Sequence, residues 1–328
     1  MAKIGMMSFA HMHAYSYAAS VKQLPDATLA AIWDDNPKRG REMARKFGAP
    51  FISNVKKFLA ADVDAVIICS ENVKHRPMVE LAAAAGKWIL CEKPLATTVK
   101  DGEAMVATCK KAGVGLGTAF PCRYAPTLIE VKSQIAAGKF GEIYAASCTN
   151  NGSYPGGWFS EPQLSGGGAT MDHTVHVVDL LRWMTGKEFT RVYCENGTLI
   201  HKKLKTDDVG VVHLEMEGGL MVSHIASWNR SRSFPTWGDV TLELIGEKGV
   251  ISVDAFNQKV NVYCDKVMRA EWVCWSGNMD LGLVKDFVAA VDARREPPIT
   301  GVDGLKAVEV TVAAYEAAKR RKPVPLTT

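Results

Sequence analysis

Short apolar runs recur through the first 120 residues, separated by segments with helical periodicity. These runs do not alternate with polar residues, and they lie at positions 3–7, 28–33, 65–69, 88–91 and 114–120. Strands that are apolar on both faces are typical of a parallel sheet covered by helices on both sides. The pattern therefore predicts a doubly wound α/β sheet, with a ligand crevice at the carboxyl ends of its strands.

After about residue 121 the pattern changes. A strand at 142–150 and a helix at 170–184 flank a long glycine-rich loop, and short strands separated by tight turns then fill residues 191–273. Two helices, at 281–293 and 303–319, close the chain. Successive short strands with little helix between them predict a large, open, mostly antiparallel sheet. The fold class is therefore α/β, with a second α/β domain after the parallel sheet.

Length and composition narrow the class of protein. A chain of 328 residues exceeds what one core usually supports, so we expect two domains, at 1–122 and 123–328. The net charge of +4 is too small and too scattered to indicate nucleic-acid binding. No apolar run approaches the ~20 residues of a membrane span, and the N-terminus does not resemble a signal peptide. Eight scattered cysteines without a C-x-x-C pair favour a reducing, cytoplasmic setting.

The first predicted strand leads into a loop that partly satisfies a dinucleotide-binding pattern. Ser8, Ala10 and His13 stand where that pattern has glycines. Small residues next to a pyrophosphate, ahead of a helix N-terminus, are the physical requirement, and Ser8 and Ala10 meet it with less tolerance for positive φ. An ordinary strand–helix turn is the alternative. The residues predicted to contact the cofactor here are Ser8, Phe9, Ala10, His11 and Met12.

The second predicted strand ends in two aspartates. Asp34 lies a little over 20 residues beyond the loop, where an acidic side chain accepts hydrogen bonds from the adenosine ribose and repels a 2′-phosphate. This position favours NAD over NADP as the cofactor. The alternative is that Asp34 and Asp35 only form a turn and a helix cap. Lys38 and Arg39 follow closely enough to keep NADP open.

Two more strand ends carry polar residues toward the same predicted crevice. Ser70, Glu71, Asn72 and His75 follow the strand at 65–69, and Glu92-Lys93-Pro94 follows the strand at 88–91. A lysine at such a position can hydrogen-bond a substrate oxygen and stabilise a developing alkoxide. The proline disfavours helical geometry at Lys93, so the strand should continue to the edge of the crevice.

A glycine-rich segment at 166–168 introduces the third group. Asp172 and His176 are four residues apart, so they share one face of a helix and can act together. His176 can take a hydroxyl proton while Asp172 orients the imidazole, as an alcohol oxidation requires. A buried histidine with a capping aspartate is the structural alternative. Zinc is the other alternative, but the sequence offers no third or fourth ligand, so we predict no metal.

Taken together, these motifs closely resemble the Gfo/Idh/MocA oxidoreductase family, which includes glucose–fructose oxidoreductase and inositol dehydrogenase. The resemblance covers nearly the whole chain and rests on the loop from Gly5, on Glu92-Lys93-Pro94 and on the segment from Gly166 to His176. It implies an N-terminal Rossmann domain and a C-terminal domain whose sheet commonly packs against another subunit, so a homodimer or homotetramer is expected. The resemblance implies Lys93, Asp172 and His176 as catalytic residues, Asn72 and Glu92 at the nicotinamide half of the cofactor, and Arg123, Asn150, Trp158 and His173 in the substrate pocket.

The expected reaction is hydride transfer between a secondary alcohol of a sugar, cyclitol or sugar derivative and a nicotinamide. Two alternatives stay open at this point. One is an enzyme that retains NAD and oxidises a sugar only transiently, for elimination, hydrolysis or epimerisation. The other is an inactive regulator that senses a sugar or NAD, against which the intact Lys93, Asp172 and His176 argue. The roles of His11, His13 and His173, the identity of the sugar and its reacting carbon are not predicted.

Overall fold

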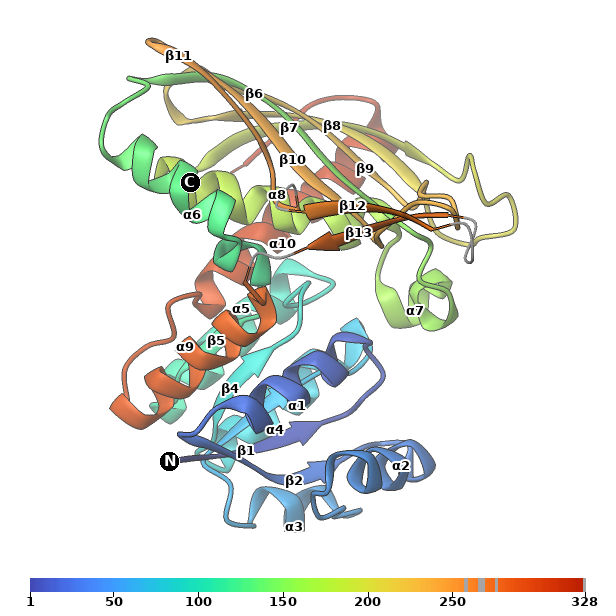
Figure 1. The fold of residues 1–328 in the computed structure, drawn as a ribbon, viewed down its shortest axis with the longest axis vertical. Coiled ribbons are helices and arrows are strands. Elements are labelled where there is room, and N and C mark those ends of the chain that lie inside the picture. Colours follow the sequence, from blue (N-terminus) through green and yellow to red (C-terminus); the bar gives the residue numbers. More distant parts are fainter. Residues whose placement is uncertain (257–258, 265–268, 275–276, 327–328) are drawn as a thin grey trace. The chain divides into compact units, whose positions relative to one another are not determined.

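The structure is a computed structural model that describes residues 1–256, 259–264, 269–274 and 277–326, with side chains for 1–256 and 277–326 (Figure 1). The chain divides into two compact units: Met1–Pro121 with Met279–Val308, and Cys122–Asn278 with Glu309–Thr328. The predicted division at residue 122 treated the domains as consecutive. The segment 279–308 instead returns to the first unit, because helix α9 (Met279–Ala293) packs against α1 (His13–Gln23) and the first strand.

The first unit is built on a five-stranded parallel sheet with the strand order β2-β1-β3-β4-β5. Its strands are β1 (Ala2–Met7), β2 (Ala27–Trp33), β3 (Ala65–Ile68), β4 (Trp88–Cys91) and β5 (Leu116–Thr118). Besides α1 and α9, its helices are α2 (Pro37–Phe47), α3 (Val55–Leu59), the 3-10 turn η1 (Asn72–Lys74), α4 (His75–Ala84), α5 (Val99–Ala112) and the first part of α10 (Gly301–Arg320). The order reverses between β1 and β3, which is where such sheets bind ligands at their carboxyl ends.

Local sequence explains most of these elements. The strands are apolar on both faces, and every residue of β3 is buried. The side chain of Asn36 caps α2 by accepting hydrogen bonds from the N–H groups of Lys38 and Arg39, and Gly48 ends that helix in the left-handed region. Helix α3 was not predicted, since a five-residue helix is too short to show a periodicity.

The second unit is built on a seven-stranded sheet with the strand order β11-β10-β6-β9-β8-β7-β14. These strands are β6 (Ile143–Gly152), β7 (Phe189–Gly197), β8 (Val209–Met216), β9 (Leu220–Ser227), β10 (Gly238–Gly246), β11 (Gly249–Asp254) and β14 (Val324–Pro325). Neighbouring strands are antiparallel, except that β6 and β9 are parallel. The predicted mostly antiparallel sheet is thus confirmed. A separate hairpin pairs β12 (Lys259–Cys264) with β13 (Arg269–Cys274).

Helix α8 (Ala169–Thr185) is the central helix of the second unit and packs on β6, β8 and β9. The glycine-rich segment before this helix is required sterically at Gly168, because a Cβ atom there would lie 1.9 Å from the backbone oxygen of Asp207. The other helices of this unit are η2 (Pro121–Tyr124), α6 (Pro126–Ala136), η3 (Gly157–Ser160), α7 (Pro162–Ser165), η4 (Glu217–Gly219) and the second half of α10 (Gly301–Arg320). Among the residues described, no helix has both the length and the apolar composition to cross a membrane.

Candidate functional site

The loop between β1 and α1 has the geometry of a phosphate-binding turn. Ser8 adopts a positive φ of 72°, a region that favours glycine, and it occupies the first glycine position of the predicted pattern. Its hydroxyl accepts a hydrogen bond from the N–H of Ala10, at 3.2 Å. Helix α1 begins without a side-chain cap or an acidic residue in its first turn. Its positive dipole end therefore fits the pyrophosphate of a dinucleotide.

Asp34 lies directly beside this loop, at the carboxyl end of β2. Its buried carboxylate accepts a hydrogen bond from the N–H of Phe9 at 2.8 Å, which links the second strand to the first loop. The guanidinium of Arg39 forms two further hydrogen bonds with the same carboxylate, at 2.7 and 2.8 Å. The structure thus brings Ser8, Phe9 and Asp34 together and adds Arg39 to them, and their contact with a cofactor stays a prediction.

The residues after β3 support the neighbouring loop. His75 is fully buried, and its Nδ1 lies 3.0 Å from the carbonyl oxygen of Pro94 and 3.2 Å from that of Leu95. Burial lowers the pKa of His75, so its imidazole is neutral and donates from Nδ1. Ser70 donates its hydroxyl proton to the carbonyl oxygen of Glu71. Ser70 and His75 therefore both bind backbone carbonyl groups, and His75 fixes the segment that follows Lys93.

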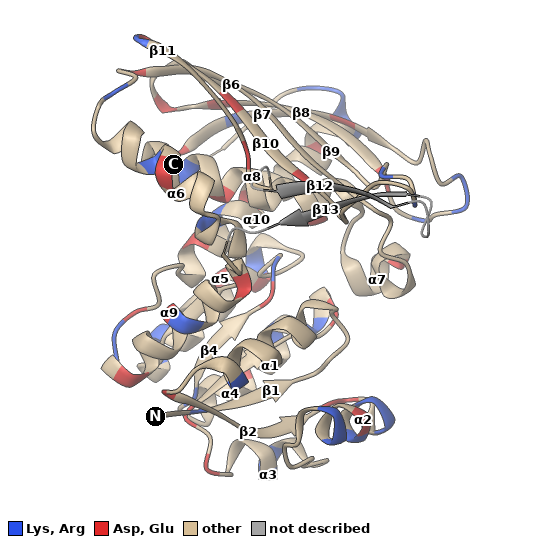
Figure 2. Ribbon diagram, in the orientation of Figure 1, with Lys and Arg blue, Asp and Glu red and all other residues tan. Residues whose placement is uncertain are grey.

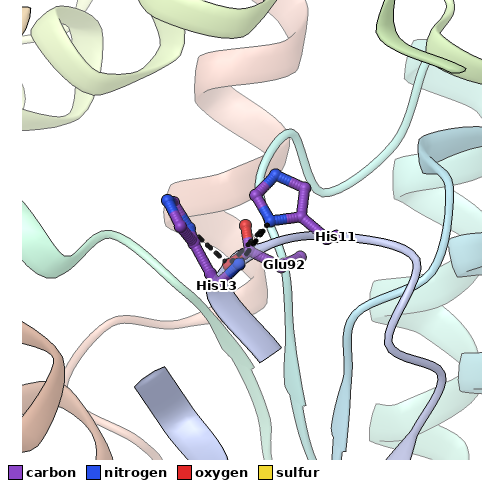
Figure 3. Close-up of side chains that lie close together, drawn as sticks. All are labelled: His11, His13 and Glu92. Atoms are coloured by element: carbon purple, nitrogen blue, oxygen red, sulfur yellow. Dashed lines mark hydrogen bonds and ion pairs between the residues drawn. The ribbon is translucent and has the colours of Figure 1, made fainter. Parts of the chain in front are cut away.

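Glu92 lies between two histidines from the first loop, as Figure 3 shows. One carboxylate oxygen, Oε1, is 2.9 Å from Nδ1 of His13 and 4.0 Å from Nδ1 of His11. The other, Oε2, accepts the backbone N–H of Lys93 at 2.8 Å. Glu92 is completely buried and Lys93, joined to Pro94 by a cis peptide bond, is 4% exposed. This cluster lies at the carboxyl ends of β1 and β4, in the predicted crevice.

The cluster fixes the charges of its members. Burial alone would raise the pKa of Glu92, but the two imidazoles and the Lys93 ammonium outweigh it and hold that pKa well below the usual range. Burial would likewise lower the pKa of His13, and the adjacent Glu92 outweighs it and raises that pKa. Glu92 is therefore a carboxylate, and His13 holds its proton to a higher pH than a free imidazole does.

The same three residues also have the spacing of metal ligands, since one atom from each of His11, His13 and Glu92 lies within 4.8 Å of the others. Each of these atoms is already used in hydrogen bonding. Nδ1 of His11 accepts the N–H of His13, at 3.2 Å, and Oε1 of Glu92 pairs with His13. We therefore interpret the cluster as an ion-paired hydrogen-bond group, and the absence of a metal stays a prediction.

In the second unit, α8 carries the predicted acid–base residues. One oxygen of Asp172, Oδ2, accepts the indole N–H of Trp228 at 3.1 Å and lies 3.3 Å from Nε2 of His173. Nδ1 of His173 lies 2.8 Å from the backbone oxygen of Asn150 and therefore donates to it. Asp172, His173 and Asn150 thus form one connected group, which extends to Trp228 on the strand side.

His176 follows one helical turn after Asp172 and is 5% exposed. Its Nδ1 lies 3.9 Å from the thiol sulfur of Cys122. The shared helix face that the four-residue spacing predicted is therefore present in the structure. Lys93 belongs to the first unit, whereas Asp172 and His176 belong to the second.

Two predicted substrate residues have local partners within the second unit. The guanidinium of Arg123 donates from Nε and Nη2 to Asp179 on α8, so this side chain is part of a buried ion pair. Trp158 stacks on Phe159, with ring centroids 4.0 Å apart, at the edge of an apolar cluster that includes Trp228. A role of Arg123 and Trp158 in substrate binding stays a prediction.

Sequence reasoning missed Trp228 and Tyr17. Trp228 reaches Asp172 from the end of β9, and the hydroxyl of Tyr17 lies 3.4 Å from Nδ1 of His13. A lone tryptophan after a strand has no motif around it. Tyr17, however, lies four residues after His13 on α1, and this helical spacing was a usable signal.

Both units match known protein families. Residues 2–120 match the profile described as "Oxidoreductase family, NAD-binding Rossmann fold", and residues 128–252 match the "GFO/IDH/MocA C-terminal domain". The first match lies within the first unit and the second match within the second unit, and together they cover most of the chain.

Related proteins and structures agree with these matches. The chain is 29% identical to a myo-inositol 2-dehydrogenase of Thermotoga maritima, over 94% of each chain. It is 26% identical to a scyllo-inositol 2-dehydrogenase (NAD(+)) of Bacillus subtilis, over 99% of this chain and 95% of the relative. Among solved structures, it superposes on GenD2 from gentamicin A biosynthesis, in complex with NAD, with a TM-score of 0.90 and 25% identity, over 100% of this chain and 97% of that one. The chain belongs to the Gfo/Idh/MocA family of oxidoreductases and carries that family's NAD-binding Rossmann domain.

Proposed function

We propose that this enzyme oxidises a secondary alcohol of a cyclitol, a pyranose or a related sugar derivative reversibly, with NAD as the hydride acceptor. The observation that carries the proposal is the acid–base arrangement on α8. There the carboxylate of Asp172, oriented by Trp228 and His173, precedes the buried His176 by one turn. An alcohol oxidation needs a base for the hydroxyl proton, and a histidine one helical turn after a fixed carboxylate is suited to this task.

The residues divide the reaction between them. His176 accepts the hydroxyl proton of the substrate as the carbon–oxygen double bond forms, and it returns that proton in the reverse reaction. Lys93 hydrogen-bonds the reacting oxygen and stabilises the negative charge that develops on it. Asp172 stabilises the imidazolium of His176. The nicotinamide, when bound, takes up the hydride that leaves the same carbon.

The polar groups beside Asp172 in the second unit fit a substrate with several hydroxyls. His173 and Asn150 place further polar atoms beside Asp172, and the Oδ1 atom of Asn150 is buried without a hydrogen-bond partner among the described residues. Such an acceptor is suited to a hydroxyl donor, because buried polar atoms are usually paired. Both relatives described above are inositol dehydrogenases, so cyclitols are the first substrates to test.

The test is the appearance of NADH absorbance when the purified protein is mixed with NAD and each member of a panel of cyclitols, sugars and sugar acids. We expect one class of compound to give turnover. In His176→Ala and in Lys93→Met the rate should fall by about 100-fold or more, since each removes a group that acts in the transition state. His213→Ala is the matched control, because His213 lies on β8 and stacks on Tyr193 instead.

Two results would contradict the proposal. One is NAD binding without reduction by any member of the panel, which would point instead to transient oxidation or to a sensor. The other is full activity in His176→Ala.

A further inference from the structure

Asp34 is the residue that should discriminate against a 2′-phosphate, and its carboxylate is saturated. Oδ1 accepts the N–H of Asn36 at 2.8 Å and Nη2 of Arg39 at 2.7 Å. Oδ2 accepts the N–H of Phe9 and Nε of Arg39, both at 2.8 Å. A carboxylate offers about four acceptor positions, and all of them are used. Asp34 therefore has none left for a pair of ribose hydroxyls while Arg39 stays in place.

Arg39 cancels the charge of Asp34 and still has capacity to bind an anion. Its guanidinium also donates from Nη2 to the hydroxyl of Ser8 at 3.1 Å and to Asp35 at 3.0 Å. Its Nη1 makes no hydrogen bond with any residue that the structure describes, and the side chain is 26% exposed. A fixed, planar guanidinium with free N–H groups is the side chain best suited to a phosphate.

The surroundings favour an anion as well. Figure 2 shows that lysines and arginines gather along α2, and they include Lys38, Arg41, Arg45 and Lys46 besides Arg39. The nearby acidic groups are already paired with a cation, since Lys74 contacts both Asp35 and Glu71. The hydroxyl of Ser8 accepts hydrogen bonds from Ala10 and Arg39, so its own proton remains for a further acceptor.

We propose that the adenosine end of the cofactor site accepts a 2′-phosphate, so that the enzyme binds NADP(H) as well as NAD(H), with Arg39 as the principal phosphate ligand and Ser8 as a second donor. Asp34, at the end of β2, does not exclude the phosphate because Arg39 neutralises its charge. This inference rests on the proposed function only for the location of the adenosine ribose. The identity of the sugar substrate does not enter it.

The test compares two small probes that differ only in the 2′-phosphate, adenosine 5′-monophosphate and adenosine 2′,5′-bisphosphate. Their dissociation constants for the purified full-length protein are measured by calorimetry, without any sugar. We expect the bisphosphate to bind at least about threefold more tightly, since one charge-assisted contact contributes that much or more. In Arg39→Gln this preference should fall by at least about threefold, because the charge-assisted contact with the 2′-phosphate is lost.

Arg41→Gln is the matched control. It removes one positive charge from the same helix, but Arg41 lies over the ring of Phe51 instead of beside Asp34. An equal loss of preference in both variants would attribute the effect to the charge of α2 in general and would overturn the assignment to Arg39. A wild-type protein that binds the bisphosphate more weakly than the monophosphate would overturn the proposal itself.

Removing Arg39 leaves the buried Asp34 without its counter-ion, so Arg39→Gln can fail to fold. Arg39→Lys then tests the contact, because it keeps the positive charge and replaces the planar guanidinium by an ammonium group. A fall of at least about threefold in the preference supports the contact, and an unchanged preference overturns it. Absence of sugar oxidation with normal binding of both probes would affect the proposed function alone, so the two failures can be told apart.

Discussion

At the scale of single residues, two neighbours hold the carboxylate of Asp172, a member of the proposed acid–base pair. Its Oδ2 receives the indole N–H of Trp228 and lies next to Nε2 of His173. Hydrogen bonds to a carboxylate fix its orientation and stabilise its charged form. In the proposed mechanism Trp228 is a positioning residue, which would act on the reaction through Asp172.

Trp228→Phe tests this role, because it keeps a ring and removes the N–H donor. We expect kcat to fall by about tenfold and the acidic limb of its pH profile to move to higher pH, as Asp172 loses one charge-assisted hydrogen bond. The measurement is the pH dependence of the steady-state rate. Phe159→Leu is the control, since it loosens the same apolar cluster without touching Asp172. An identical, unshifted profile in both variants would reduce Trp228 to a packing role.

The His13–Glu92 pair makes stability depend on pH. The pKa of His13 is raised in the folded protein by the adjacent Glu92, against the effect of burial. A group with a raised folded pKa stabilises the protein fully below its unfolded pKa of about 6.5, and this contribution is lost as the pH rises through the folded value. The difference in the free energy of unfolding between wild type and His13→Gln should therefore shrink as the pH rises above about 6.5.

Urea unfolding at a series of pH values measures this difference. Glu92 makes stability depend on pH in the opposite direction. Its pKa is lowered in the folded protein, so its stabilising contribution is present above the ordinary pKa of a glutamate and is lost as the pH falls. If the difference in the free energy of unfolding between wild type and His13→Gln grows from neutral to alkaline pH, His13 and Glu92 do not form an ion pair in solution.

At the scale of elements, α8 depends on partners from other parts of the second unit. Its N-terminus has no cap of its own, and the carboxylate of Asp207 accepts the N–H groups of Gly168 and Thr170 instead, at 3.1 and 2.8 Å. The hydroxyl of Tyr315 accepts the N–H of Gly168 and donates to Asp207 at 2.6 Å. Burial, together with the Asp207 carboxylate, raises the pKa of Tyr315 well above its usual value, so the hydroxyl stays protonated.

Tyr315→Phe should lower the free energy of unfolding by about 1–2 kcal/mol, because it removes buried hydrogen bonds at a helix N-terminus. It should also lower kcat, since α8 carries both Asp172 and His176. Chemical denaturation and steady-state kinetics give the two values. Tyr193→Phe is the control, because that hydroxyl donates to Glu195 on the exposed side of β7. Equal stability of Tyr315→Phe and wild type would show that Asp207 caps α8 by itself.

At the scale of the whole molecule, the seven-stranded sheet has one face without helices among the described residues of its unit, whereas α6 and α8 cover the other (Figure 1). On the open face, strand register brings Val250, Ile245, Ala145 and Met221 side by side across four strands. Met221 is 64% exposed and Val250 59%. A row of apolar side chains on an exposed sheet favours an interface between subunits, so we propose a homodimer or homotetramer formed through this face.

Met221→Lys should disrupt that assembly, because it places a charge at an exposed position of the apolar row. Light scattering coupled to size-exclusion chromatography measures the mass in solution. Leu199→Lys is the matched control, a similar change at a site that is 68% exposed and lies after β7. A monomeric wild-type protein would contradict the proposal, and so would a variant that keeps the wild-type mass.

The sequence by itself determined the features that depend on local periodicity and spacing. Apolar runs without alternation specified the parallel sheet, and the ends of those runs located Asp34 and Lys93 at its carboxyl edge. The four-residue spacing placed Asp172 and His176 on one face of α8. Such features depend on unbroken apolar runs or on the 3.6-residue repeat of a helix, so neighbouring residues are enough to reveal them.

Only the tertiary structure decided which distant groups meet. It paired His13 with Glu92, 79 positions away, and Tyr315 with Asp207, 108 positions away. It placed β9 parallel to β6, and it returned residues 279–308 to the first unit. It also placed the guanidinium of Arg39 against the carboxylate of Asp34. Contacts of this kind depend on strand order and helix packing, and no local pattern of residues encodes them.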